Sequence, residues 1–185
     1  MPQQPTRLFY DSEFTGLHQH TTLISLALVS ECGREFYAEF NDYAQDQCDT
    51  WITENVLKHT RFIGRHAQAF AAQENRLAVC FGDRAFVGQH LREWLKQFAA
   101  IEIWADCLAY DWVLFCELFG GALSLPRNIF YMPFDLVSLF KCRGIDPDCP
   151  RSEFAGQTNP TPHNALTDAR VLKSCYFRLQ NAKGE

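Results

Sequence analysis

Five side chains in three separate segments are of the types that bind divalent metals and transfer protons. Asp11 and Glu13 stand two apart in DSEFTGL, Asp111 lies in AYDWVLF, and His163 and Asp168 stand five apart in PHNALTDA. Residues two apart on a strand point to the same side, so Asp11 and Glu13 would present paired carboxylates. Like charges on one face repel unless a cation compensates them, and a divalent ion is the usual agent.

Each segment has a simpler interpretation when taken alone. Asp11 and Glu13 could be exposed acids at a strand end, and Asp111 could cap a helix. Asp106, at the end of the preceding apolar run, competes with Asp111. We favour Asp111 because it is a charged residue between two aromatic residues in an apolar stretch. The ordered set as a whole, more than any single member, indicates a site.

The eight cysteines are scattered and show no paired C-x-x-C spacing. Several lie within apolar stretches, namely Cys80, Cys107 and Cys116. Free, buried thiols in a reducing compartment are therefore favoured over disulfides. Cys142, Cys149 and His163 could be imagined as zinc ligands, but no fourth partner has ligand-like spacing.

The net charge of −5 is not typical of a simple nucleic-acid binder, which is usually basic. The charged residues are, however, unevenly distributed along the chain. Residues 1–57 carry nine acids and two bases, whereas residues 58–100 carry seven bases and three acids. A site built from carboxylates needs cations, and bound divalent metals would cancel much of the local negative charge. The basic stretch could equally be a solvated helix face.

The chain length predicts one compact domain over residues 1–185. No apolar run approaches the ~20 residues that a membrane span needs, so we expect no membrane partner. The N-terminal MPQQPTR lacks the apolar region of a signal peptide, which favours a cytoplasmic location.

The elements that must position the five side chains follow from the apolar pattern. Residues 7–10 form a strand that ends at Asp11, and residues 22–30 and 34–40 form two more strands of a consecutive antiparallel meander. Two further strands are expected at 101–105 and 128–132. The sequence therefore predicts an α/β fold with a five-stranded mixed sheet flanked by helices.

Helix-like spacing covers five segments of the chain. The expected helices are 44–59, 83–99 with Asp83 as N-cap, 111–118, a helix opened by Pro133 and Asp135 that runs through Phe140, and 163–179. Gly120, Gly121 and Gly144 would end two of them. Residues 145–162 are rich in Pro, Asp, Ser and Thr and are expected to form a loop.

The ordered set D-x-E, Y-D and H-x-A-x-x-D-A resembles the DEDDh class of 3′-to-5′ exonucleases, which have the ribonuclease H-like fold. DSEFTGL is similar to the first motif of that class, with Phe14 in place of a Thr. Cys107 stands where an Asn is common, four residues before the middle Asp, which concerns a substrate contact and not the metal site.

A closer resemblance within that class is to the polyadenylate-specific exoribonuclease AS-like family of mycobacteria. RLFYDSEF, LISLALVS followed by GREFYAEF, IEIWADCLAYD and HNALTDAR carry it over roughly residues 7–180. The resemblance is loosest across 60–100 and 120–160, so a preference for particular 3′ ends stays open. Related exoribonucleases are often homodimers, and the resemblance implies one here.

The resemblance implies a role for each site residue. Asp11, Glu13, Asp111 and Asp168 would hold two Mg²⁺ ions, or Mn²⁺, around the scissile phosphate. His163 would take the proton of the attacking water. The terminal nucleotide would meet the loop after Glu13, at Phe14, Thr15, Gly16 and Leu17, with Leu17 as the wedge. Phe14 and Leu17 could instead be ordinary core residues, and His18 and His20 are expected to lie in a surface loop.

The expected function is therefore a 3′-to-5′ exoribonuclease that acts on single-stranded RNA ends. A DNA exonuclease with the same chemistry is the nearest alternative, because the choice of RNA rests on the resemblance alone. A nucleic-acid-binding module without activity is a third possibility, which the presence of all five expected residues disfavours.

Overall fold

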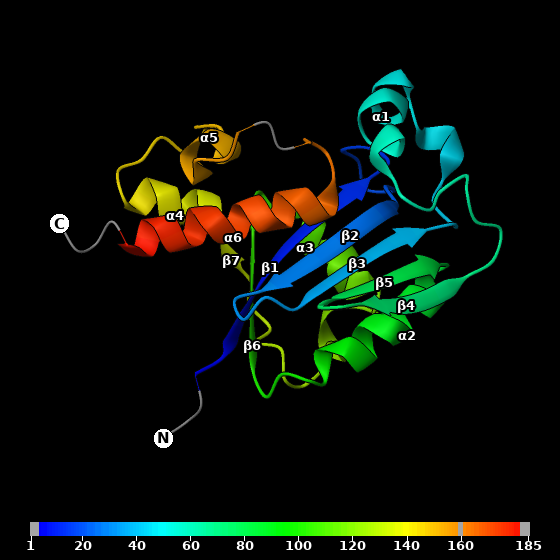
Figure 1. Ribbon diagram of the computed structural model, residues 1–185, viewed down its shortest axis with the longest axis horizontal. Coiled ribbons are helices and arrows are strands. Elements are labelled where there is room, and N and C mark those ends of the chain that lie inside the picture. Colours follow the sequence, from blue (N-terminus) through cyan, green and yellow to red (C-terminus); the bar gives the residue numbers. More distant parts are fainter. Residues whose placement is uncertain (1–3, 159–160, 182–185) are drawn as a thin grey trace.

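The computed structural model describes residues 4–158 and 161–181. Across them runs a seven-stranded sheet with the strand order β4-β5-β3-β2-β1-β6-β7, seen in Figure 1. The strands are β1 (Thr6–Phe14), β2 (Leu23–Ser30), β3 (Glu35–Phe40), β4 (Phe70–Glu74), β5 (Leu77–Gly82), β6 (Ile101–Ala105) and β7 (Phe134–Asp135). The prediction of a mixed α/β sheet flanked by helices is confirmed, but the number of strands is seven and not five.

The three N-terminal strands form the predicted antiparallel meander. All eight residues of β2 are buried, as its continuous apolar run predicts for a central strand. The first strand is longer than expected, since β1 continues through Asp11 and Glu13 to Phe14. Both acids therefore lie within the strand, and Glu13 is paired in register with Ser25 of β2.

The hairpin of β4 and β5 is absent from the sequence-based prediction. It turns at Asn75, which has a positive φ of 55°, and β5 then pairs with β3 in parallel. The run Leu77–Gly82 is apolar and is bounded by turn residues, which is the signal of a strand. Strand β4 is exposed over four of its five residues, so it has no apolar alternation by which to recognise it.

The predicted strand at 128–132 is wrong. In this segment only a single bridge forms, between Ile129 and Ile101, and the edge strand is instead the two-residue β7. The bridge is flanked by backbone hydrogen bonds between Ile101 and residues 128 and 130, after which the chain leaves the sheet. Ile129 is buried, but Phe130, Tyr131 and Met132 are exposed, so most of this apolar run lies at the surface.

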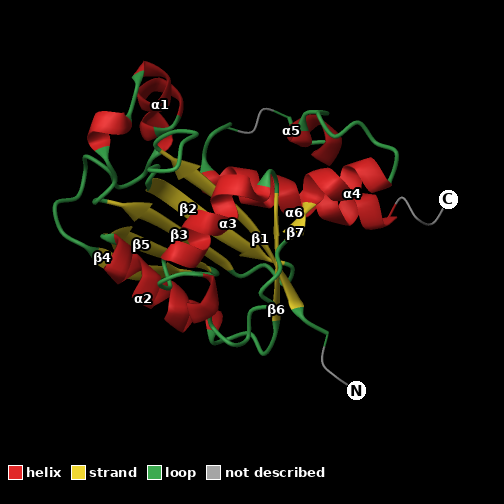
Figure 2. Cartoon of the chain, turned by 180° about the vertical axis from the view of Figure 1, so that it is seen from behind, coloured by secondary structure: helices red, strands yellow, loops and turns green. Residues whose placement is uncertain are grey.

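Helices cover both faces of the sheet. Helix α6 packs on β1 and β2 in Figure 1, and Figure 2 shows α2 and α3 on the opposite face. The helices are α1 (Thr50–Asn55), α2 (Arg84–Leu95), α3 (Leu108–Glu117), α4 (Leu136–Cys142), α5 (Arg151–Ala155) and α6 (Ala165–Asn181). The alternation along β1 separates the two cores, because Phe9 packs against α6 whereas Leu8 and Tyr10 face α2 and α3.

Several helix predictions are confirmed and others need correction. Asp83 caps α2 through the amide of Phe86, and Asp135 caps α4. The expected helix at 44–59 is broken into α1 and two short 3-10 turns, of which Gln45–Gln47 precedes it and Leu57–His59 follows it. The expected loop at 145–162 contains α5, and its residues 159–160 lie outside the described residues.

All eight cysteines are free thiols, as expected. Cys80 and Cys116 are buried, but Cys107 is exposed at the turn before α3, contrary to the prediction for it. Within the described part of the chain, no helix combines the length and apolar character that crossing a membrane requires.

Candidate active site

Three of the predicted acids meet where β1 passes under α6. Oxygen atoms of Asp11, Glu13 and Asp168 all lie within 4.8 Å of one another. Asp11 and Glu13 follow Phe9 in the alternation of β1, so they face α6, whose first turn carries Asp168. Strand alternation and the start of one helix thus bring together residues 157 positions apart in the chain.

The electrostatics of these carboxylates are unfavourable without a cation. Burial, followed by the charges of Asp168 and Asp111, raises the pKa of Glu13 to about 8. Burial and the neighbouring carboxylates raise the pKa of Asp11 well above its usual value. Burial raises the pKa of Asp168 to about 6, against hydrogen bonds from the backbone that lower it. Because desolvated like charges disfavour ionisation, a divalent cation bound between them would restore the carboxylate forms.

Asp111 lines the same cavity of about 360 Å³ but is held slightly apart from the other three acids. Its Oδ1 accepts a 2.6 Å hydrogen bond from the hydroxyl of Ser12, the residue between the two acids of β1. Helix α3 begins at Leu108, earlier than predicted, after Cys107 adopts a left-handed conformation with φ of 54°. Asp111 therefore lies within the first turn and points into the cavity instead of capping the helix.

Asp106, the alternative to Asp111, also lines the cavity and is bound to a partner. Arg151 of α5 donates to both of its carboxylate oxygens, at 2.8 and 3.2 Å. The same guanidinium donates to the carbonyls of Pro147 and Cys149. Through these bonds, Asp106 and Arg151 hold α5 and the preceding loop against the end of β6. Because the carboxylate of Asp106 already has a cation partner, Asp111 is the better candidate metal ligand.

His163 lines the cavity from the turn before α6, in a left-handed conformation with φ of 53°. Asn164 fixes this turn: its side-chain carbonyl accepts from the amide of Thr167, and its side-chain amide donates to the carbonyl of His59. The backbone amide of Asn164 donates to Asp168 at 3.0 Å. The helix therefore starts two residues later than predicted, and His163 lies on the turn instead of on the helix.

Of the four residues predicted to contact substrate, one lines the cavity and the other three lie in the loop that follows β1. Phe14 lines the cavity and lies 5.6 Å, between ring centroids, from Tyr110. The hydroxyl of Thr15 is buried and donates to Gln47 at 2.6 Å, and the amide of Gly16 donates to Thr21. These hydrogen bonds hold the loop in place. The side chain of Leu17 takes no part in them and is 77% exposed.

Trp51 contacts His163 of the candidate site, although it is not among the predicted residues. Its ring meets that of His163 edge to face at 4.8 Å, and the side chain is 49% exposed. It is carried by α1, the short helix beyond the ends of the central strands at the upper right of Figure 1. An exposed Trp on a polar six-residue helix is the available signal, but the sequence holds no indication that it would meet His163.

Known proteins resemble the chain over most of its length. Residues 6–178 match the family model described as 3′-5′ exoribonuclease Rv2179c-like domain. Two relatives from Mycobacterium tuberculosis are each 30% identical over 169 residues, which is 89% of this chain and 87% of theirs. They are named 3′-5′ exoribonuclease MT2234.1, from strain CDC 1551 / Oshkosh, and 3′-5′ exoribonuclease Rv2179c, from strain ATCC 25618 / H37Rv. The chain therefore belongs to the family of 3′-5′ exoribonuclease Rv2179c-like domains.

Proposed function

We propose that this protein is a two-metal 3′-to-5′ exoribonuclease that removes nucleotides from the 3′ ends of single-stranded RNA. The observation that carries the proposal is the cluster of Asp11, Glu13 and Asp168, whose oxygens lie within 4.8 Å of one another in a cavity that His163 also lines. The family and the names of both relatives support a nuclease that acts on RNA. We also propose that the mixed sheet is the ribonuclease H-like fold.

The residues of the cluster fit magnesium, with manganese as a substitute. All the candidate ligands, including Asp111, offer carboxylate oxygens, which hard cations prefer and which do not favour zinc or copper. When bound, such ions make a water more acidic and offset the charge that develops at a phosphate. The raised pKa of Glu13 and of Asp168 supports this assignment, because a divalent cation compensates the repulsion that burial intensifies.

His163 is the proposed general base. Burial, followed by the nearby charge of His59, lowers its pKa below the usual value of 6.5. The ring is therefore largely neutral at pH 7 and can accept the proton of the attacking water. The edge-to-face contact with Trp51 and the Asn164 bonds that fix the turn restrict where the imidazole can lie.

The RNA strand itself would be held by stacking and by the loop after Glu13. We assign Leu17 as the wedge at the last base, with Phe14 and the backbone of Thr15 and Gly16 near the sugar. The exposed ring of Trp51 offers a further surface for a base. Selection of RNA over DNA requires a contact with the 2′-hydroxyl, for which Glu13 is the candidate.

We further propose that the active protein is a cytoplasmic homodimer. Phe130, Tyr131 and Met132 are exposed next to a groove of about 570 Å³ that Phe130 and Phe134 help to line, and a second copy would cover this apolar surface. Light scattering at micromolar concentration should give twice the 21.3 kDa chain mass. A mass that stays near that of one chain would reject the dimer without affecting the proposed chemistry.

The direct test of the function is the product pattern from 5′-labelled strands. With Mg²⁺, an RNA should give a ladder that shortens one nucleotide at a time, whereas a DNA of the same sequence should be degraded far more slowly. EDTA should abolish the ladder. Equal rates on both sugars would reject RNA selectivity, and one internal cut with no ladder would reject an exonuclease.

A further inference from the structure

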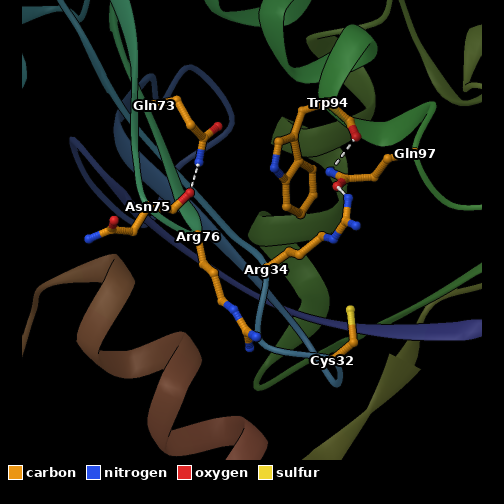
Figure 3. A pocket seen from close by; sticks show the side chains of 7 residues that line it. All are labelled: Cys32, Arg34, Gln73, Asn75, Arg76, Trp94 and Gln97. Atoms are coloured by element: carbon orange, nitrogen blue, oxygen red, sulfur yellow. Dashed lines mark hydrogen bonds between the residues drawn. The ribbon is translucent and has the colours of Figure 1, made fainter.

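A second polar hollow, of about 540 Å³, lies at the end of the sheet opposite the carboxylates. Figure 3 shows it between the β2–β3 turn, the β4–β5 hairpin and the last turn of α2, with Arg34 and Arg76 among the side chains that line it. Arg34 pairs with Ser30, and Ser30 is opposite Leu8, five residues before Glu13 on β1. The hollow is therefore separate from the catalytic cavity.

The lining of this hollow is positively charged although the chain is acidic. It contains two arginines and no carboxylate, in a protein of net charge −5. Four glutamates lie close to it in sequence, and each is bound to a different cation. These pairs are Glu31 with Arg7, Glu35 with Arg170, Glu74 with Arg61 and Glu93 with Lys96. Among the described residues, no carboxylate forms an ion pair with Arg34 or Arg76, so their charges are available to a ligand.

Hydrogen bonds fix some of the side chains that line the hollow. The guanidinium of Arg34 donates to the side-chain carbonyl of Gln97, whose amide nitrogen donates to the carbonyl of Trp94 at 2.7 Å (Figure 3). The side chain of Arg76 makes no hydrogen bond with any residue that the structure describes, and its donors are free. The half-buried ring of Trp94, packed on Phe36, forms an apolar wall beside both arginines.

We propose that this hollow binds the upstream part of the RNA whose 3′ end occupies the catalytic cavity, an inference that rests on the proposed function. The planar guanidinium groups of Arg34 and Arg76 match the oxygens of phosphodiesters, which they bind in a bidentate manner. Trp94 gives one base an apolar surface, and this kind of contact tolerates any sequence. The ligand is thus a single strand that is recognised through its backbone.

The position of the hollow sets the length of RNA that can use it. Five residues along β1 at ~3.3 Å each, and two strand spacings of ~4.8 Å, separate Arg34 from Glu13 by about 20 Å. At ~3.4 Å per stacked nucleotide, this straight line corresponds to about six nucleotides, which is the least that can connect the two sites. The path over the surface is longer, because Trp94 packs on the α2 side of the sheet whereas Asp11 and Glu13 face α6. A dinucleotide cannot reach the hollow, whereas a 12-nucleotide RNA can.

The experiment compares the R34Q/R76Q double variant with the unmodified protein on a dinucleotide and on a 12-nucleotide RNA. Both arginines are exposed, and hydrolysis of the dinucleotide reports whether the variant is folded. Lys141→Gln, which removes an exposed charge from α4, is the matched control. We expect KM for the 12-nucleotide RNA to rise roughly tenfold in the double variant, while its KM for the dinucleotide stays the same. K141Q should have the KM of the unmodified protein for both RNAs.

Binding of the 12-nucleotide RNA in EDTA provides a second readout that does not depend on turnover. The slope of log Kd against log salt concentration should fall by about 1.4 in the double variant, at ~0.7 for each phosphate that an arginine no longer neutralises. An unchanged slope, or equal effects on both RNA lengths, would overturn the inference. If the unmodified protein hydrolyses neither RNA, the proposed function fails and the binding slope alone decides whether the hollow holds RNA.

Discussion

The hydroxyl of Ser12 donates a 2.6 Å hydrogen bond to Oδ1 of Asp111, and so joins the strand that carries Asp11 and Glu13 to the helix that carries Asp111. Ser12 points to the side of β1 opposite the paired acids, where it is buried. The bond also lowers the pKa of Asp111, which burial raises to about 6. One side chain thus sets both the position and the charge of the fourth acid.

Replacement of Ser12 by Ala should leave Asp111 without this partner. Because hydrogen bonds to charged groups contribute about 1.5–3 kcal/mol, we expect kcat to fall at least tenfold and the Mg²⁺ concentration for half activity to rise. Ser174→Ala, which removes a hydroxyl from α6 whose bonds go to Arg170 and Gln157, is the control. A normal magnesium requirement in Ser12→Ala would show that Asp111 is positioned by other contacts.

The stability of the metal-free protein should decrease as pH rises. Glu13 has a pKa of about 8 in the folded protein against an ordinary value of 4.5, so the folded state binds a proton that the unfolded state has lost between these values. Its contribution is complete below pH 4.5 and is lost by about pH 8. The free energies of unfolding by urea in EDTA at pH 5 and pH 8 should differ by roughly 4 kcal/mol, since the titration of Glu13 alone spans about three pH units in this range at about 1.4 kcal/mol each.

Magnesium should reverse this dependence, since it binds the ionised carboxylates. Glu13→Gln should make the free energy of unfolding in EDTA depend less on pH, because the amide does not titrate. A free energy of unfolding in EDTA that is constant or rises from pH 5 to pH 8 would contradict the electrostatic description of the cluster.

His163→Ala should lower kcat by about 10²–10⁴ while the protein stays folded, because general base catalysis contributes factors of this size. In the unmodified protein, the rate should decrease as pH falls through a value below 6.5, where the imidazole becomes protonated. Rates measured from pH 5 to pH 8 should show this decrease in the unmodified protein and not in the variant. Full activity of His163→Ala would exclude His163 as the base.

Trp51→Ala should raise KM and lower kcat, each several-fold, since the ring contacts His163 and offers a stacking surface worth about 1–3 kcal/mol per base. Trp51→Phe retains an aromatic ring and should recover most of the loss. Because the side chain is 49% exposed, thermal unfolding of both variants should be close to normal. Failure of Phe to rescue the Ala variant would indicate a role other than stacking.

The parts of the fold with strong local patterns could be predicted from the sequence. The buried run of β2, the cap of α2 at Asp83 and the meander of the first three strands are local consequences of apolar spacing and capping. The β4–β5 hairpin could not be recognised because β4 is exposed and lacks alternation. The run at 128–132 predicts a strand that does not form. Its apolar residues give the pattern of a buried strand, although Phe130, Tyr131 and Met132 are exposed.

The prediction that the five candidate residues form a site stays a prediction, although the structure places all of them around one cavity. Order and spacing are enough to select them. The contacts that hold them depend on tertiary structure, such as Ser12 with Asp111 over 99 positions and Asp106 with Arg151 over 45. Neither pair has a local sequence signal, and the contact of Trp51 with His163 depends on the packing of α1 against Ile24 of β2.

The most direct measurement of the central claim is release of the terminal nucleotide from 3′-labelled RNA by single-acid variants. In Mg²⁺, we expect Asp11→Asn, Glu13→Gln and Asp168→Asn each to lose at least 10²-fold in rate, because each removes a charged ligand of the cluster. Asp148→Asn, which changes an exposed acid on the loop before α5, should be fully active. If any of the three cluster variants retains the unmodified rate in Mg²⁺, these carboxylates are not the metal-binding centre of the reaction.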